Sequence, residues 1–125
     1  MLLHYYYYYY YYLLALHLAC SAFNIVTAKV LVSHNANVNF QNEDGLSPLH
    51  ISSENGEDEL VDLLLEKGAN VNALCDKGKG PVYYALKSVK SNQQPSVNKS
   101  LKCIYLLVKN GADFKSYVRF MFIYI

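Results

Sequence analysis

A spacing of 33 residues recurs through the chain and constrains its fold more than any other feature. Four pairs of residues or triplets have this separation: His17 and His50, residues 37–39 and 70–72, Gly45 and Gly78, and Pro48 and Pro81. A fixed period in this range is typical of stacked structural repeats. Each repeat is a unit that cannot bury its apolar side chains alone, so the chain is predicted to form a solenoid.

The clearest copy of the repeat covers residues 42–74. It opens with a turn in which Gly45 is free to take a positive φ. Ser47 can cap a first helix whose first position is Pro48, where the missing N–H costs nothing. A second helix ends at Gly68 in the left-handed conformation. The unit is therefore a turn followed by two helices.

The copy before it, residues 13–41, departs from this pattern at three positions. Ala15 replaces the proline, Phe23 replaces the glycine between the helices, and Asn35 replaces the closing glycine. Asparagine is the residue next best suited to the left-handed conformation, so the change at Asn35 is expected to cost little.

The copy after it, residues 75–115, is longer than the others. Gly111 lies 43 residues after Gly68, so about ten residues are inserted, near 91–100. The insert is polar and contains Pro95, which predicts a loop between the two helices. In the second helices we expect one apolar face each, formed by Val26, Val30 and Leu31, by Leu60, Leu63 and Leu64, and by Ile104, Leu107 and Val108.

Two short motifs give the repeat a family resemblance. Ser47-Pro48-Leu49-His50 resembles the Thr-Pro-Leu-His signature of the ankyrin repeat, and residues 67–72 resemble its closing turn. The resemblance covers about three repeats, over residues 13–115. It implies an all-α solenoid of helix–turn–helix pairs with β-turn tips. It also implies that His17 and His50, which share one repeat position, hydrogen-bond to the turn.

Both ends of the chain lie outside the predicted repeats. Residues 1–12 are a low-complexity tail with tyrosine from 5 to 12, without helical or strand periodicity. We expect a disordered or strand-like tail, or a wrongly placed gene start. Residues 1–28 carry no Lys, Arg, Asp or Glu, so a membrane anchor is an alternative, although eight phenol hydroxyls are costly in hydrocarbon. Residues 116–125 form an apolar tail without a further repeat.

Little in the sequence predicts metal binding or catalysis. Net charge is +1, which provides no field to attract nucleic acid. Cys20, Cys75 and Cys103 are odd in number and widely spaced, which predicts reduced, mostly buried thiols rather than disulfides or a zinc site. The acidic run at 57–59 opens a helix, where negative charge suits the helix dipole. No catalytic motif is present, so we predict a chain that is not an enzyme and has no cofactor or metal.

The ankyrin resemblance implies a non-catalytic protein–protein interaction module of the adaptor or scaffold type. Such modules bind through their turn tips and the concave face made by the first helices, and Leu46 is expected at an exposed tip. The predicted contacts are Asn42, Glu43, Asp44 and Leu46 at one tip, Lys77 and Lys79 at the other, and Ser53, Glu54, Leu86 and Lys87 on the concave face.

The expected partner is another protein, not a nucleic acid, a membrane or a small molecule. The expected location is cytoplasmic, with the nucleus as an alternative. Two other functions stay open: a membrane-tethered ankyrin protein anchored by the N-terminal apolar stretch, and a regulatory segment of a larger ankyrin-containing protein, since neither end has the polar outer face that usually caps a solenoid.

Overall fold

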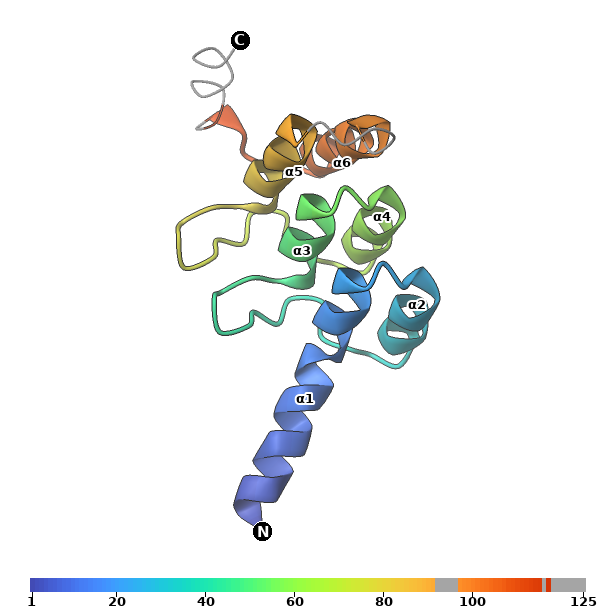
Figure 1. Cartoon of the computed structure of the whole chain (residues 1–125), viewed down its shortest axis with the longest axis vertical. Coiled ribbons are helices and arrows are strands. Elements are labelled where there is room, and N and C mark those ends of the chain that lie inside the picture. The colour runs from blue at the N-terminus through green and yellow to red at the C-terminus, as the bar shows by residue number, and fades with distance from the viewer. Residues whose placement is uncertain (92–96, 116, 118–125) are drawn as a thin grey trace.

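The computed structural model describes residues 1–91, 97–115 and 117 of the chain. Within these residues there are six helices and no strand: α1 (Leu2–Ser21), α2 (Ile25–Ser33), α3 (Pro48–Glu54), α4 (Asp58–Glu66), α5 (Pro81–Lys90) and α6 (Val97–Lys109). Figure 1 shows them as three stacked helix pairs, which confirms the predicted all-α solenoid. The insertion predicted near 91–100 and the predicted apolar tail at 116–125 lie largely outside the described residues.

The helices form two layers. In the inner layer α3 packs against both α1 and α5, and in the outer layer α4 packs against both α2 and α6. Two long loops, residues 34–47 and 67–80, project from the same side of the stack (Figure 1) and are called the first and second finger below. The side of α1, α3 and α5 that meets the fingers is called the inner face.

The start of α3 follows the predicted capping pattern. The Ser47 hydroxyl accepts a hydrogen bond from the backbone N–H of His50, and the His50 ring nitrogen Nδ1 accepts one from the backbone N–H of Ser47 at 3.0 Å. Pro48 occupies the first turn of the helix. Two backbone N–H groups at the start of α3, which have no partner within the helix, are thereby hydrogen-bonded. This capping supports a helix of only seven residues.

Residues with positive φ end the helices where the repeat predicts them. Gly68 has a φ of +87°, and Asn35, at the equivalent position of the first repeat, has +64°. The prediction that Asn35 takes the left-handed conformation in place of the closing glycine is therefore confirmed. Phe23 also takes a positive φ, +56°, where the second repeat has Gly56. A bulky residue is strained in this region, so the first repeat is the less regular copy.

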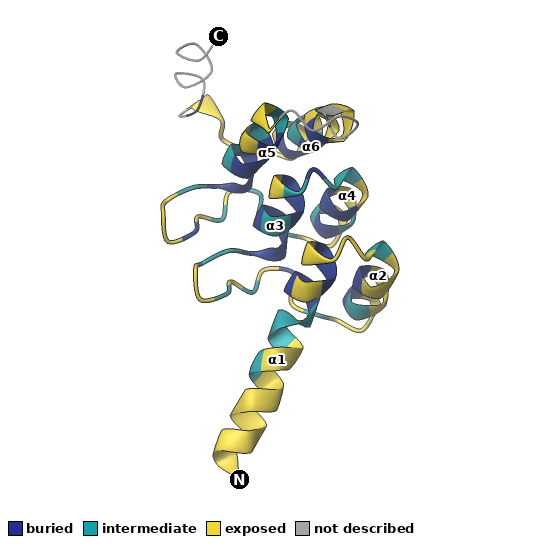
Figure 2. Cartoon of the chain, in the orientation of Figure 1, coloured by how far each residue is buried: buried dark blue, intermediate teal, exposed yellow. Residues whose placement is uncertain are grey.

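A continuous apolar core runs through the three helix pairs. Its most completely buried large side chains include Leu16, Leu49, Leu60, Leu64 and Leu107, each with at most 1% of its surface exposed. Figure 2 shows that the buried sides of neighbouring pairs face one another. The predicted apolar face of α4 is thus confirmed at Leu60 and Leu64, while Leu63 is half-buried.

The predicted apolar face of α2 is wrong. Val26 and Val30 are 69% and 53% exposed, whereas Ala28 and Val32 are buried. Only three of the nine side chains of α2 are polar, so several faces of this helix are equally apolar. The spacing of apolar residues therefore could not identify the face that packs.

In α6 the apolar face is rotated from the predicted one. Leu107 is fully buried as expected, and Ile104 is half-buried, but Val108 is 37% exposed. The helix instead buries Ser100 and Cys103, which lie seven and four residues before Leu107. Four residues make about one helical turn and seven about two, so the side chains of Ser100, Cys103 and Leu107 lie on one side of the helix.

The tyrosine run is helical, so the expected disordered or strand-like tail is not what the structure shows. Helix α1 runs unbroken from Leu2 through the tyrosines to Ser21. Its first half projects beyond the stack and is exposed (Figures 1 and 2). Packing of residues 16–20 already fixes helical turns, so extending the helix adds hydrogen bonds without a second nucleation step. None of the helices in the described part of the chain, α1 included, has the length and apolarity needed to cross a membrane.

Candidate functional site

Two buried histidines tie the inner helices to the fingers. The His17 ring nitrogen Nε2 donates to the backbone carbonyl of Leu46 at 2.9 Å, and His50 Nε2 donates to that of Lys79 at 3.0 Å. Both carbonyls lie 29 residues after their histidine. The predicted hydrogen bond from histidine to turn is therefore confirmed in two repeats, and it fixes each finger relative to the inner face.

Burial lowers the pKa of both histidines below 6.5, although their hydrogen bonds to backbone carbonyls oppose the shift. Both rings are therefore neutral at neutral pH. This state suits a ring that donates from one nitrogen and, in His50, accepts at the other.

We expect the free energy of unfolding to fall as the pH drops below about 6.5. In the unfolded chain the two imidazoles bind protons near pH 6.5, whereas in the folded protein they bind them only at lower pH. The stability they contribute is therefore complete above the unfolded pKa and is lost as the pH falls through the folded values. Urea unfolding at about pH 7.5 and about pH 5.5 measures the loss. His50→Gln should reduce the loss; a loss as large as that of the unmodified chain would contradict this.

Asparagine side chains join the base of each finger to the next repeat. Asn39 donates through its amide to the Gly68 carbonyl at 3.1 Å and accepts from the Asn70 N–H at 2.6 Å. Asn72, one repeat later, bonds in the same way to the Gly111 carbonyl at 3.1 Å and the Asp113 N–H at 2.8 Å. The recurrence of asparagine at 39 and 72, the last positions of the two triplets, is thus explained by contacts between repeats.

The two fingers also bond to each other. The Asp76 N–H donates to the Asp44 carbonyl at 3.1 Å, and the Gln41 side-chain amide donates to the Leu74 carbonyl at 2.9 Å. Backbone and amide groups therefore hold the fingers side by side, in addition to the packing of the helices beneath them.

The tip of the first finger, residues 42–46, is called the first fingertip and contains four of the predicted contact residues. Asn42 is used within the turn, because its side-chain oxygen accepts from the N–H groups of Asp44 and Leu46, at 3.0 Å each. Glu43 and Asp44 are exposed, as expected. Leu46 is half-buried, so the prediction of an exposed apolar tip residue is wrong. The chain has turned toward α1 by this point, and the bond from His17 holds the Leu46 carbonyl there.

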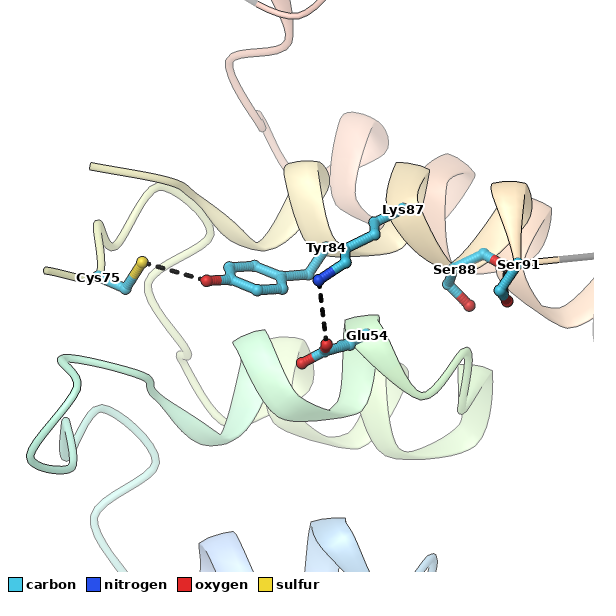
Figure 3. Close-up of polar contacts among 6 residues, drawn as sticks. All are labelled: Glu54, Cys75, Tyr84, Lys87, Ser88 and Ser91. Carbon is cyan, nitrogen blue, oxygen red and sulfur yellow. Dashed lines mark hydrogen bonds and ion pairs between the residues drawn. The ribbon is translucent and has the colours of Figure 1, made fainter. Parts of the chain in front are cut away.

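The remaining predicted residues are more widely spread. Lys77 is exposed, and the Lys79 ammonium lies 4.9 Å from the ring centroid of Tyr83. On the inner face the Lys87 ammonium and the Glu54 carboxylate form an exposed ion pair at 3.8 Å (Figure 3). Leu86 is half-buried against the core. Ser53 is fully buried, so its prediction as a surface residue is wrong. It lies one residue before Glu54 on α3, and this step of about 100° around the helix axis turns it toward the interior.

All three cysteines are free and buried, in agreement with the prediction. Burial raises the pKa of the Cys103 thiol to about 12 and also raises that of Cys20. Cys75 differs. Burial raises the pKa of its thiol, but hydrogen bonds from Tyr84, whose hydroxyl lies 3.3 Å from the sulfur (Figure 3), and from backbone groups of the second finger outweigh burial and leave the pKa below its usual value.

A hollow of about 360 Å³ lies between the first fingertip and the inner face. Its walls come from α1, the first finger and α3, and comprise Tyr10, Leu14, His17, Leu18, Ser21, Asn42, Glu43, Asp44 and Ile51. The sequence prediction included the three finger residues but missed the helical wall. A signal was available for Leu18, because it lies 33 residues before Ile51 and so shares its repeat position. In the described part of the chain no three His, Cys, Asp or Glu side chains gather as a metal site would require.

Comparison with known proteins identifies the repeats. A family model described as ankyrin repeats, in three copies, matches residues 16–117. A tyrosine-protein kinase of Hydra vulgaris is 41% identical over 70 residues, which are 54% of this chain and 9% of the kinase. The mouse B-cell lymphoma 3 protein homolog is 32% identical over 79% of this chain and 21% of its own length. The mouse ankyrin repeat and MYND domain-containing protein 1 is 36% identical over 79% of this chain and 11% of its own length.

The chain therefore spans only a small part of the length of these relatives. Ankyrin repeats are generally protein–protein interaction modules, and domains built from them are typically non-catalytic. The family model covers most of the chain, and its three copies agree with the three helix pairs. The chain belongs to the ankyrin-repeat family.

Proposed function

We propose that the chain is a non-catalytic binding module of the adaptor or scaffold type, which holds a partner protein against its inner face and fingertips. The observation that carries the proposal is the hollow beside the first fingertip, where apolar side chains of α1 and α3 stand next to polar groups of the finger. Leu18 in its wall is 63% exposed. Exposed apolar surface rimmed by polar residues often marks a site of protein association.

The construction of the surface supports this role. The fingers are held by the histidine bonds and by bonds between the fingers, so the backbone around the hollow is fixed before a partner arrives. A preorganised surface loses less conformational entropy on binding. The same role would suit a repeat segment within a longer protein, which is the setting of the matched repeats in the relatives.

We further propose that the repeats divide at 13–41, 42–74 and 75–115, that residues 1–12 serve as an extension of the first inner helix, and that the module acts in the cytoplasm. Glu54, Lys87, Lys77 and Lys79 would then be peripheral contacts around the hollow. Glu54, Lys77 and Lys87 are exposed and Lys79 is half-buried, and an exposed charge is expected to contribute little to affinity on its own.

A matched pair of substitutions tests the role of the inner face. Peptides that bind the full chain are first selected from a displayed random library. Leu18→Gln should weaken their binding by about tenfold or more, because burial of a leucine side chain contributes about 1.5–3 kcal/mol. Val26→Gln is the control, since Val26 is similarly exposed, at 69%, but lies on the outer helix α2.

Failure to select any binder would count against the module, as would binding that Val26→Gln weakens as much as Leu18→Gln. Circular dichroism of both variants should show an unchanged helical signal, because both side chains are exposed.

A further inference from the structure

The charged side chains in the wall of the hollow beside the first fingertip are all negative. Two carboxylates, Glu43 and Asp44, lie in its wall, and no lysine or arginine does. His17 is buried and, with its lowered pKa, uncharged at neutral pH. Neither carboxylate forms an ion pair with a lysine or arginine in the part of the chain that the structure describes. The hollow therefore presents uncompensated negative charge.

The two carboxylates are not needed to build the finger. Asp44 contributes its backbone N–H to Asn42 and its backbone carbonyl to Asp76, but its side chain has no part in the turn. Glu43 accepts one long hydrogen bond, 3.4 Å, from the Tyr10 hydroxyl, and its carboxylate is exposed. Both groups are thus available to a ligand, and both can be neutralised without disturbing the backbone.

The wall formed by α1 and α3 is mostly apolar and aromatic, with Ser21 and the buried, neutral His17 as its polar members. Leu14, Leu18 and Ile51 line it, and the Tyr10 side chain stands at the same hollow as Glu43. Apolar walls suit the methylene stem of a long cationic side chain, whose charged head can reach the carboxylates at the rim. A planar guanidinium adds two further contacts: it can stack on an aromatic ring, and it can bond a carboxylate through two parallel N–H groups.

We propose that the hollow takes an arginine side chain, presented by an extended segment of the partner protein with an apolar residue beside it. The inference rests on the proposed function and names the chemistry of the partner. Arginine is favoured over lysine because an ammonium has neither the planar face for Tyr10 nor the paired donors for a carboxylate.

The test uses the full chain and the library-selected peptides, each compared with versions in which arginine is replaced by citrulline, which is neutral and of nearly the same shape, or by lysine. We expect the selected peptides to be enriched in arginine. Citrulline should weaken binding to the unmodified chain by about tenfold, as for loss of a charge-assisted hydrogen bond. In the double variant Glu43→Gln/Asp44→Asn the same change should weaken binding by no more than about twofold.

Asp62→Asn/Glu66→Gln is the matched control, because it removes two exposed carboxylates from the outer helix α4 and should preserve the tenfold effect of citrulline. Selected peptides without arginine, or an equal citrulline effect in the double variant, would overturn the inference. If such peptides still lose affinity with Leu18→Gln, the binding role of the inner face stands while the arginine assignment falls. Self-association of the chain that the peptides relieve would make a second copy the occupant and would also overturn it.

Discussion

Replacing Leu64 by alanine is expected to lower the free energy of unfolding by about 2–5 kcal/mol. Leu64 is fully buried in α4, the outer helix of the middle repeat. The lost methyl groups leave a cavity that rigid helix neighbours fill only in part, so the cost includes both transfer and cavity terms. Domains of this size are stable by only about 5–15 kcal/mol, so the loss is a large fraction of the total. Urea unfolding followed by circular dichroism measures it.

The effect should reach the whole stack. Helix α4 packs against α2 and α6, and α3 packs against α1 and α5, so the middle repeat supplies both interfaces between repeats. Stability of such arrays is a sum of repeat and interface terms. Leu101→Ala is the control, because Leu101 is 51% exposed on α6 and should change stability by only about 0.5 kcal/mol. A loss in Leu64→Ala no larger than in this control would contradict the described core.

Replacing Gly45 by alanine is expected to cost about 2–4 kcal/mol, from two separable causes. Gly45 has a φ of +75°, which an alanine adopts only at a cost of about 1–2 kcal/mol. In addition, a Cβ at this position would lie 2.6 Å from the Asp76 carboxylate oxygen Oδ1 and 2.8 Å from the Asp76 backbone nitrogen. The backbone atom cannot move without breaking the bond between the fingers.

Gly78 provides the matched control for the first cause. It occupies the same position in the second finger with nearly the same φ, +71°, but a Cβ there would meet no atom within 4 Å. Gly78→Ala should therefore lower the free energy of unfolding only by the cost of placing an alanine at positive φ, about 1–2 kcal/mol. The difference between the two variants, measured by urea unfolding, reports the contact between the fingers. Equal costs would mean that the fingers do not touch at Asp76.

The repeat itself could be predicted from the sequence because its signals are local and recur. Ser47 and Pro48 set the start of α3 by capping and by a preset φ, whatever surrounds them. Asn35 takes the left-handed conformation that its position in the period demands. The bond from each histidine to the turn was implied by the ankyrin resemblance, and the structure shows it at equivalent positions of two repeats.

The orientation of individual side chains could not be predicted in the same way. Ser53 is buried and Glu54 exposed, although they are neighbours, because burial depends on the rotation of α3 against α4 and α5. Val26 and Val30 show the same limit, since α2 has more than one apolar face. Such choices depend on tertiary packing, which periodicity does not encode when a helix is short or uniformly apolar.

Only three of the nine residues that line the candidate site were predicted from the sequence, for a related reason. Glu43 and Asp44 belong to a turn that the ankyrin resemblance implies is an exposed binding tip, so they could be named in advance. Leu18 could have been named as well, because it lies 33 residues before Ile51, but Tyr10 could not, because the tyrosine run has no periodicity of its own and is predicted to be a disordered or strand-like tail. Only the extension of α1 brings the Tyr10 side chain to the first fingertip.

The most direct test of the proposed binding surface is the footprint of a selected peptide on the chain, measured by amide hydrogen exchange. The account predicts that binding slows exchange in the first finger around residues 42–46 and in the parts of α1 and α3 that line the hollow, and leaves the outer helices α2, α4 and α6 unchanged. Slower exchange confined to the outer helices, with none at the first finger, would contradict it.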